Sequence, residues 1–211
     1  MKKTLLTLAL VAVSAAAFAQ GKITFGNDSL HYFVIGSALA GDAGGGVQST
    51  VANTAGGATG AILAGPMPSG KTLQASLYAG TTASSITLRT TLPMTGAFWG
   101  PTAGRMVNQI ITFGDIGFNT SANFQIVLTD VGATLPASLD NTIQTTSIAN
   151  ALYFGTSGAF TRSTGSSLTA PTLVSGTWAA NNLVINAVPE PSSMALAGIG
   201  AASLLIFRRK K

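Results

Sequence analysis

The central stretch of the chain, residues 20–188, has a composition that favours β-structure over helices. Forty of its 169 residues are Ser or Thr and 23 are Gly, whereas it contains no Glu and only two Lys. Glu and Lys are good helix formers, while Thr prefers strands and Ser and Gly prefer turns. This length is also sufficient for one domain with its own hydrophobic core. The sequence therefore predicts a single, mainly β domain.

The charges of the chain are concentrated at its two ends. The formal net charge is +5, but within residues 20–188 five basic residues balance five acidic ones. The basic residues are Lys22, Lys71, Arg89, Arg105 and Arg162, and the acidic ones are Asp28, Asp42, Asp115, Asp130 and Asp140. Nucleic acids are bound by clustered Lys and Arg, whereas these basic residues are widely spaced. We therefore expect no nucleic-acid binding.

The residue types that most enzymes use are scarce. The chain has no Cys and a single His, His31, which excludes disulfides, thiol nucleophiles and Cys-ligated metals. The G-x-S-x-G motif of Ser nucleophiles is absent. Three Asp residues, Asp115, Asp130 and Asp140, come near one another in sequence, but each is close to an expected strand or turn end, where Asp commonly caps the backbone. We expect no cofactor and no enzymatic activity.

The first 19 residues have the three parts of a secretory signal peptide. Two Lys precede a short apolar run over residues 4–16, and the small residues Ala17 and Ala19 occupy the −3 and −1 positions of a cleavage site before Gln20. The alternative is an uncleaved membrane anchor. We predict a signal peptide over residues 1–19 and export of the remainder by way of signal peptidase.

The last 24 residues have the features of a sorting signal. They begin with the sequence Val188, Pro189, Glu190 and Pro191, continue with 14 apolar or small residues at positions 194–207, and end with the basic cluster Arg208, Arg209, Lys210 and Lys211. As a helix the apolar run would extend about 21 Å, which makes it a marginal membrane span. The basic cluster would stay in the cytoplasm as a stop-transfer signal.

This tail resembles the PEP-CTERM sorting signal of bacterial exosortase substrates. The similarity covers Pro-Glu-Pro, the short apolar helix and the basic cluster in the same order. It implies that an exosortase-like membrane protease recognises the Pro-Glu-Pro region and releases or transfers the protein. The prolines fix the backbone in an extended form that suits a protease cleft. The alternative is an ordinary tail anchor. The predicted organisation is a signal peptide at 1–19, a β-rich domain at 20–187 and the sorting signal at 188–211.

The pattern of the central stretch predicts short strands joined by turns. Polar and apolar residues alternate over residues 73–79, which predicts a half-buried strand. Further strands are expected at residues 22–25, 30–35, 86–89, 98–99, 107–113, 124–128, 173–174, 177–178 and 183–186, with a Gly-rich loop at 41–60 and one helix at 136–152. Residues 72–80 and 123–130 also resemble strands of other exported PEP-CTERM proteins. Strands without intervening helices favour an antiparallel β-sandwich of jelly-roll or Ig-like type, flanked by the signal peptide and a C-terminal membrane helix.

One segment matches the pattern of a phosphate-binding P-loop. Residues 65–72 fit G-x-x-x-x-G-K-[ST], and Asp130 ends a strand in the manner of a Walker B motif. However, Pro66 and Pro68 remove two backbone donors, and the alternation after Thr72 predicts a strand where a P-loop needs a helix. We interpret the segment as a turn before a strand.

Two further patterns allow alternative functions. The aromatic residues Trp99, Trp178, Tyr32, Tyr78 and Tyr153 could form a stacking face for sugars, although in a sandwich such residues are more often core. Asp28, His31 and Asp42 could hold a cation, but their spacing matches no known ligand set.

Together these observations predict an exported protein of the cell envelope or extracellular matrix, associated with biofilm or exopolysaccharide, with a structural or adhesive role. Its predicted partners are signal peptidase, an exosortase-like protease and, transiently, the cytoplasmic membrane that anchors the precursor. The alternative is a carbohydrate-binding module that acts on exopolysaccharide, which would add exopolysaccharide as a partner.

Overall fold

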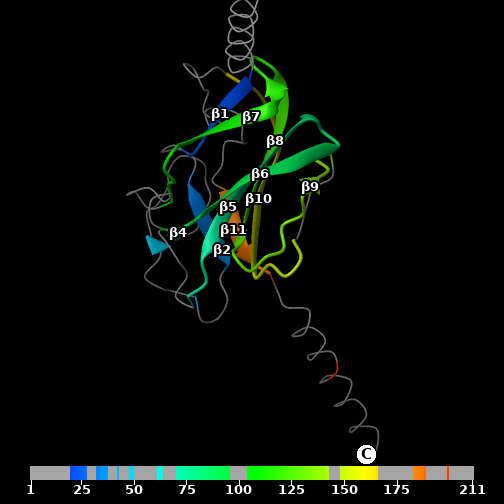
Figure 1. Ribbon diagram of the computed structural model, residues 1–211. Coiled ribbons are helices and arrows are strands. Elements are labelled where there is room, and N and C mark those ends of the chain that lie inside the picture. The colour runs from blue at the N-terminus through cyan, green and yellow to red at the C-terminus, as the bar shows by residue number, and fades with distance from the viewer. Residues whose placement is uncertain are drawn as a thin grey trace, which may run out of the picture.

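The computed structural model describes residues 20–27, 32–37, 42, 48–49, 61–63, 70–95, 104–142, 148–165, 183–188 and 199. This part of the chain is mainly β, as predicted (Figure 1). The expected strands at 98–99, 173–174 and 177–178 lie outside it, as do the signal peptide and almost all of the tail. Among the described residues, none belongs to a helix that is long and apolar enough to cross a membrane.

The strands form one large sheet and one small sheet. Their bounds are β1 (Gln20–Phe25), β2 (Phe33–Ser37), β3 (Gln48–Ser49), β4 (Ala61–Leu63), β5 (Leu73–Thr82), β6 (Ser85–Pro93), β7 (Gln109–Gly117), β8 (Ser121–Asp130), β9 (Ser138–Leu139), β10 (Tyr153–Ser163) and β11 (Leu183–Ala187). The large sheet has the order β3-β4-β2-β11-β10-β8-β5-β6-β9, and β1 pairs with β7 in the small sheet.

Strand pairing is antiparallel with one exception. β2 and β11 run parallel, with Val34 opposite Val184 and Ile35 opposite Ile185. A parallel pair needs a long connection, and the 145 residues between β2 and β11 supply it. The predicted antiparallel pairing therefore holds for the described strands except at this pair, where the two ends of the domain meet as neighbouring strands.

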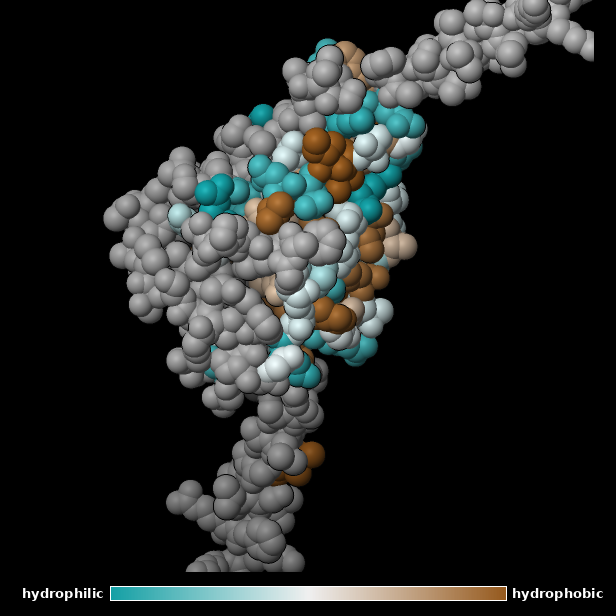
Figure 2. Space-filling view, turned by 60° about the vertical axis from the view of Figure 1, so that its left-hand side comes forward, coloured by the Kyte–Doolittle hydropathy of each residue, from teal (hydrophilic) through white to brown (hydrophobic). Residues whose placement is uncertain are grey.

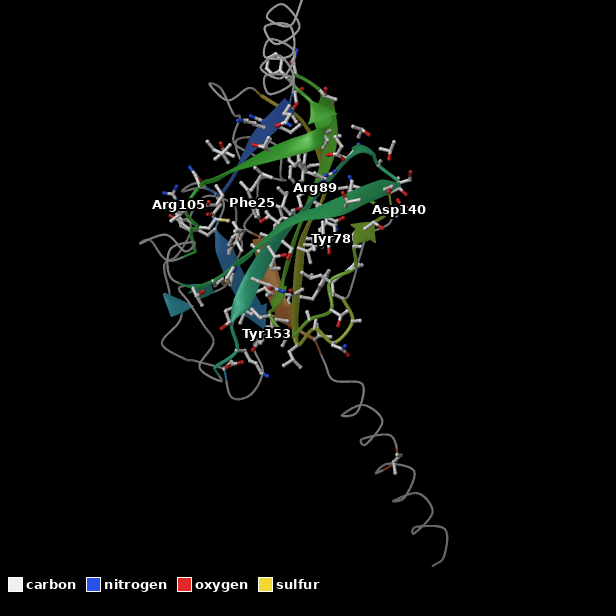
Figure 3. All side chains as sticks on the ribbon, viewed as in Figure 1. Phe25, Tyr78, Arg89, Arg105, Asp140 and Tyr153 are labelled. Atoms are coloured by element: carbon white, nitrogen blue, oxygen red, sulfur yellow. The ribbon has the colours of Figure 1, made fainter. Side chains whose placement is uncertain are left out.

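The main core lies between the two sheets. Ile23 and Phe25 of β1 and Phe113 of β7 are fully or almost fully buried, and they belong to the same hydrophobic cluster as Leu77 and Phe124 of the large sheet. The ring centroids of Phe113 and Phe124 are 6.0 Å apart. Figure 3 shows Phe25 in the interior of the domain. Burial of these aromatic side chains accounts for the docking of the small sheet.

The opposite face of the large sheet is covered by the chain between β8 and β10. Tyr78, Ile86 and Val127 of the sheet are buried together with Leu139 and Ile148 of this segment. Because both faces are covered, Gln74, Ser76 and Tyr78 of β5 are all buried. The predicted half-buried pattern for residues 73–79 is therefore wrong, although the predicted strand is confirmed.

The helix predicted at residues 136–152 does not form in the described part of that segment. Ser138 and Leu139 form β9 against β6, and the Asp140 side chain accepts a hydrogen bond from the Thr142 N–H at 2.9 Å, which makes a turn. Thr134 and Ala149 form an isolated bridge. The apolar residues that suggested a helix instead cover the sheet, where Leu139 pairs directly opposite Ile86.

The two ends of the domain can be located along β8. At the first end, called the β1 end, Gln20 lies opposite Gly117, and the Gly117 carbonyl accepts a hydrogen bond of 2.6 Å from the Thr164 hydroxyl, next to where β10 meets Ser121. The hairpin between β5 and β6 also lies at this end, since Gly80 pairs with Asn123. The other end, called the tail end, contains Asp130 and the last residue of β11.

Strand β8 gives the separation of these two ends. It has ten residues, and a strand rises about 3.3 Å per residue, so the β1 end and the tail end lie about 30 Å apart. In Figure 1 the small sheet lies at the top of the domain and the end of β11 lies near the bottom.

Candidate functional site

The predicted sorting signal begins at Val188, directly after the last strand of the large sheet. Ala187 is the last residue of β11 and lies opposite Tyr153 of β10. The Val188 N–H then donates a hydrogen bond of 2.8 Å to the Leu152 carbonyl. The other predicted sorting residues, Pro189, Glu190, Pro191, Arg208, Arg209, Lys210 and Lys211, lie outside the described residues. The folded domain thus extends to the residue immediately before the Pro-Glu-Pro sequence.

Asp130 fixes the part of β10 that holds the start of the sorting signal. Its side chain is 3% exposed, and Oδ1 accepts hydrogen bonds from the Leu152 N–H at 2.7 Å and the Tyr153 N–H at 3.2 Å. A carboxylate that accepts backbone N–H groups away from water makes strong hydrogen bonds. The Asp130 carboxylate, the peptide group between Leu152 and Tyr153, and the Val188 N–H therefore form one continuous hydrogen-bonded series.

A second buried carboxylate holds the same strand from the other side. The Tyr153 hydroxyl donates a hydrogen bond of 2.5 Å to Oδ2 of Asp42, and both residues are fully buried. Asp42 was a candidate cation ligand together with Asp28 and His31, which lie outside the described residues. Its hydrogen bond to Tyr153 instead connects the Gly-rich loop to the start of β10. Sequence analysis missed this role because the two residues are 111 positions apart.

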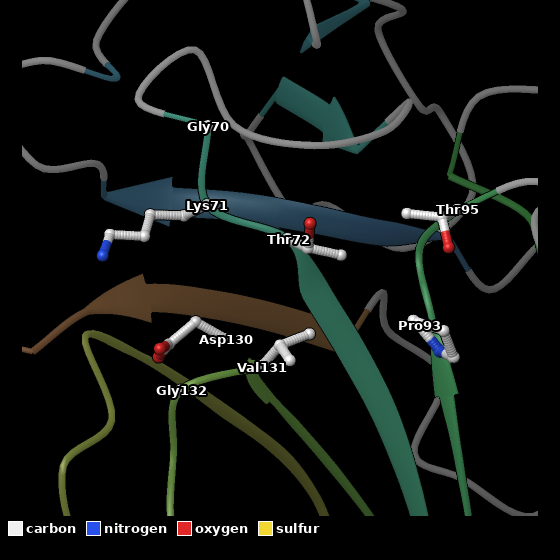
Figure 4. Close-up of a pocket in the computed structure, with 8 residues that line it drawn as sticks. All are labelled: Gly70, Lys71, Thr72, Pro93, Thr95, Asp130, Val131 and Gly132. Carbon is white, nitrogen blue, oxygen red and sulfur yellow. The ribbon is translucent and has the colours of Figure 1, made fainter.

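A cavity of about 470 Å³ opens at the tail end (Figure 4). It is lined by Gly70, Lys71, Thr72, Pro93, Thr95, Asp130, Val131 and Gly132. The Val131 N–H donates to the Thr72 carbonyl at 2.8 Å, which connects its two sides. Figure 4 shows the Lys71 side chain and the Asp130 carboxylate extending toward the same side. Lys71 is exposed, as is Val131, at 53%.

This cavity contains the end of the P-loop pattern without the fold of a P-loop. Lys71 and Thr72 do lie near Asp130, but β5 begins at Leu73, immediately after them. A P-loop needs a helix there, whose N-terminal N–H groups hold the phosphates. The predicted strand after Thr72 is confirmed. Of the predicted turn the structure describes only residues 70–72, where Gly70 lies in the left-handed region at φ 79°.

The predicted signal-peptide cleavage site lies directly before the first strand. Gln20 begins β1, while Ala17 and Ala19 lie outside the described residues. Gly21 follows at a close approach of two backbones, because a Cβ atom there would lie 2.6 Å from the Gly117 carbonyl oxygen. The start of the domain therefore has no spacer after the expected cleavage position.

The aromatic residues that the structure describes do not form a sugar-stacking face. Tyr78 and Tyr153 are fully buried, and burial raises the pKa of Tyr78 to about 12. The Tyr78 hydroxyl donates to the Pro136 carbonyl at 2.9 Å. Trp99 and Trp178 lie outside the described residues, and Tyr32 is partly exposed. These two buried tyrosines belong to the core, as aromatic residues in a sandwich usually do.

The acidic residues do not converge on one point. Asp115 forms a two-pronged ion pair with Arg89 at 2.8 and 2.6 Å, and the hydrogen bond from Arg89 lowers the pKa of Asp115. Hydrogen bonds from Thr142 lower the pKa of Asp140, which lies beside the β5–β6 hairpin because the Asn141 N–H donates to the Ala83 carbonyl. Asp130 lies at the opposite end. Within the part of the chain that the structure describes, no three His, Asp or Glu side chains are grouped to hold a metal ion.

The fold and its tail define a class of protein: a β domain that passes directly into a C-terminal sorting signal. The family model of the PEP-CTERM protein-sorting motif matches residues 187–210. The chain therefore carries a PEP-CTERM protein-sorting motif, and this motif supports export, processing by exosortase and sorting to the envelope. The comparisons with curated proteins and with solved structures found no match.

Proposed function

We propose that this protein is a non-enzymatic structural or adhesive component of the cell envelope or extracellular matrix. In this proposal signal peptidase removes residues 1–19, the tail anchors the precursor through a short membrane helix, and an exosortase-like protease then separates the domain from the tail. The observation that carries the proposal is the sorting motif at residues 187–210. This motif begins at Ala187, the last residue of β11 in the large sheet.

The end of β11 supports cleavage close to the domain. Pro189 and Pro191 have no backbone N–H and cannot donate to a sheet ladder, while Val188, the last described residue before them, still donates to the Leu152 carbonyl. An extended segment without internal hydrogen bonds is the form that a protease cleft accepts. A cut beyond Val188 would leave all of β11 in the product.

The surface supports a role in association. Only ten charged residues occur in residues 20–188, and low charge protects a protein poorly against self-association. Ile110 is 61% exposed and Phe118 is 51% exposed. Figure 2 shows hydrophobic patches set among polar and neutral ones on the described part of one face. These features suit a protein that packs with copies of itself in a matrix.

The sorting step is tested by replacing Pro189, Glu190 and Pro191 with Ala. We expect a full-length species that stays in the membrane fraction, whereas a control variant with Ser192→Ala and Ser193→Ala is processed normally. Cell fractionation followed by intact-mass measurement gives both the location and the two cut sites. Normal release of the triple variant would overturn the exosortase assignment.

The structural role is tested on the protein that the cell releases. Sedimentation of this natural product should show concentration-dependent association. A product that stays strictly monomeric at high concentration would contradict the structural role and leave the sorting assignment in place.

A further inference from the structure

The anchored precursor has little chain between its domain and the membrane. Val188 is fixed in the domain by its hydrogen bond to Leu152, and the apolar run of the tail begins at Met194. Six residue steps span at most about 22 Å when fully extended, which is less than the length of about 30 Å that β8 gives the domain. The tail end must therefore stay close to the lipid surface, and this step rests on the proposed function.

We propose that the tail end of the domain is a membrane-contact surface that binds anionic phospholipid headgroups while the precursor is anchored. The surface consists of residues 70–72, Thr95 and residues 131–132, which line the cavity together with Pro93 and Asp130. The series of hydrogen bonds from Val188 through Leu152 to Asp130 places this cavity beside the exit of the tail.

The exposed side chains of this surface suit a lipid headgroup. Lys71 provides a cation for a lipid phosphate, and Thr72 and Thr95 provide hydroxyl donors around a cavity of about 470 Å³, a volume typical of small-ligand pockets. Val131 provides an apolar side chain for the interfacial region. Asp130 also lines the cavity, but the residue is 3% exposed and its Oδ1 accepts two backbone N–H groups, which offset part of its negative charge.

The opposite end of the domain carries both carboxylates and basic side chains, among them Arg162 of β10, which lies opposite Ala122, and Arg89, which is paired with Asp115. Asp140 lies beside the β5–β6 hairpin, and the side chain of Asp115 is 60% exposed near the end of β7. Carboxylates are repelled by an anionic membrane, whereas Lys near its surface is attracted. Figure 3 shows Asp140 and Arg89 in the upper half of the domain and Tyr153, which lies opposite Ala187 of β11, in the lower half. The short tether therefore favours the orientation in which the tail end faces the membrane.

The absence of Cys from the chain allows a direct test with single-Cys variants. Val131→Cys probes the proposed surface, Ser84→Cys probes the exposed hairpin at the β1 end, and Ala201→Cys reports insertion of the tail. The exported precursor is purified with its tail intact from a host without exosortase. It is labelled with a fluorophore and reconstituted into vesicles of phosphatidylglycerol and phosphatidylcholine that carry a headgroup-linked quencher.

We expect the label at position 131 to be quenched severalfold more strongly than the label at position 84. Quenching at 131 should weaken in pure phosphatidylcholine, at high salt and after Lys71→Glu, because the contact is electrostatic. Lys22→Glu, a charge reversal outside this surface, should leave it unchanged.

The outcomes separate this inference from the proposed function. An unquenched label at 131 beside a quenched label at 201 overturns the membrane contact and leaves the anchored precursor intact. An unquenched label at 201 contradicts the anchored precursor itself. If the label at 131 is quenched as strongly in pure phosphatidylcholine as in vesicles with phosphatidylglycerol, binding to anionic headgroups is contradicted. If the fluorescence of the label at 131 changes only when exosortase is added, headgroup binding is also contradicted, and the surface is assigned to the protease.

Discussion

The two terminal strands of the domain are held in different ways. β1 pairs with β7 in a two-stranded sheet, and its Ile23 and Phe25 side chains enter the core. β11 lies inside the large sheet between β2 and β10, and the residues it meets are fixed by the buried carboxylates Asp130 and Asp42. The first strand has a strand partner on one side only and a single bridge, from Lys22 to Gly165, outside that ladder, whereas the last strand has a strand on each side. The end that passes into the sorting signal is therefore an interior strand of its sheet.

The largest loss of stability is expected from a substitution in β1. Phe25 is fully buried, and Phe25→Ala should lower the free energy of unfolding by about 3–5 kcal/mol because it leaves a cavity between the sheets. Urea denaturation measures this loss. Phe118→Ala, at a side chain that is 51% exposed, is the control and should change stability little. Similar losses for the two variants would show that β1 is not held by burial.

A somewhat smaller loss, with a local signature, is expected at the tail end. Asp130→Ala leaves the N–H groups of Leu152 and Tyr153 without their acceptor, which should cost about 3 kcal/mol. Hydrogen exchange should also become faster at Leu152, Tyr153 and Val188 than at the β1 end. Asp140→Ala is the control at an Asp that serves only a turn. If hydrogen exchange became equally faster across the whole domain, the hydrogen bonds of Asp130 would not stabilise the tail end specifically.

Tyr153→Phe removes one hydrogen bond from the same region. Loss of the hydroxyl that donates to Asp42 should cost about 2 kcal/mol, the range for a hydrogen bond to a charged group. The aromatic ring remains, so the packing of the core is preserved. Thermal unfolding measures the effect. No loss of stability would mean that the Asp42 carboxylate does not contribute to holding β10.

The smallest expected effect is a pH dependence of the unfolding free energy, caused by the ion pair between Arg89 of the large sheet and Asp115 of the small sheet. The hydrogen bond from Arg89 lowers the pKa of Asp115 in the folded protein, so the pair stabilises the fold above the unfolded-state pKa near 3.8, and this contribution is lost as the pH falls through the lower folded-state value. Because the Asp115 side chain is 60% exposed, the contribution should be at most about 1 kcal/mol.

The measurement compares wild type with Asp115→Asn at pH 7 and at pH 3. The difference in unfolding free energy should shrink at the lower pH. Arg89→Lys keeps the charge but removes the two-pronged geometry, and it should retain only part of the difference. A difference that grows on acidification would contradict the assigned direction of the pKa shift.

The sequence predicted those parts of the fold that depend on local pattern. The strands around residues 73–79 and 124–128 were found because apolar and polar residues alternate there, and the sorting motif was found because its three parts are contiguous. The helix predicted at 136–152 is wrong because its apolar residues are only loosely spaced, and Leu139 and Ile148 pack instead with Tyr78 and Val127 of the sheet. Tertiary contacts overrode local spacing there.

The roles of individual residues were less accessible to sequence analysis. Asp130 was interpreted as a strand-end cap, but its hydrogen-bond donors lie 22 and 23 residues later. The parallel pairing of β2 with β11 joins residues about 150 positions apart, for which a single sequence contains no signal. The exposed Lys71 and Val131 were brought to one surface only by the pairing of β5 with β8.

The position of β11 also determines how the domain responds to force. A pull on the tail acts along the axis of a strand that is bonded to β10 on one side and β2 on the other. Such a load shears several hydrogen bonds at once, whereas a pull perpendicular to an edge strand breaks them one after another. A protease that draws the Pro-Glu-Pro segment into its cleft would thus meet a mechanical stop at Val188. A domain attached to a surface through this end would resist extraction by flow, since forced unfolding is governed by the unfolding rate.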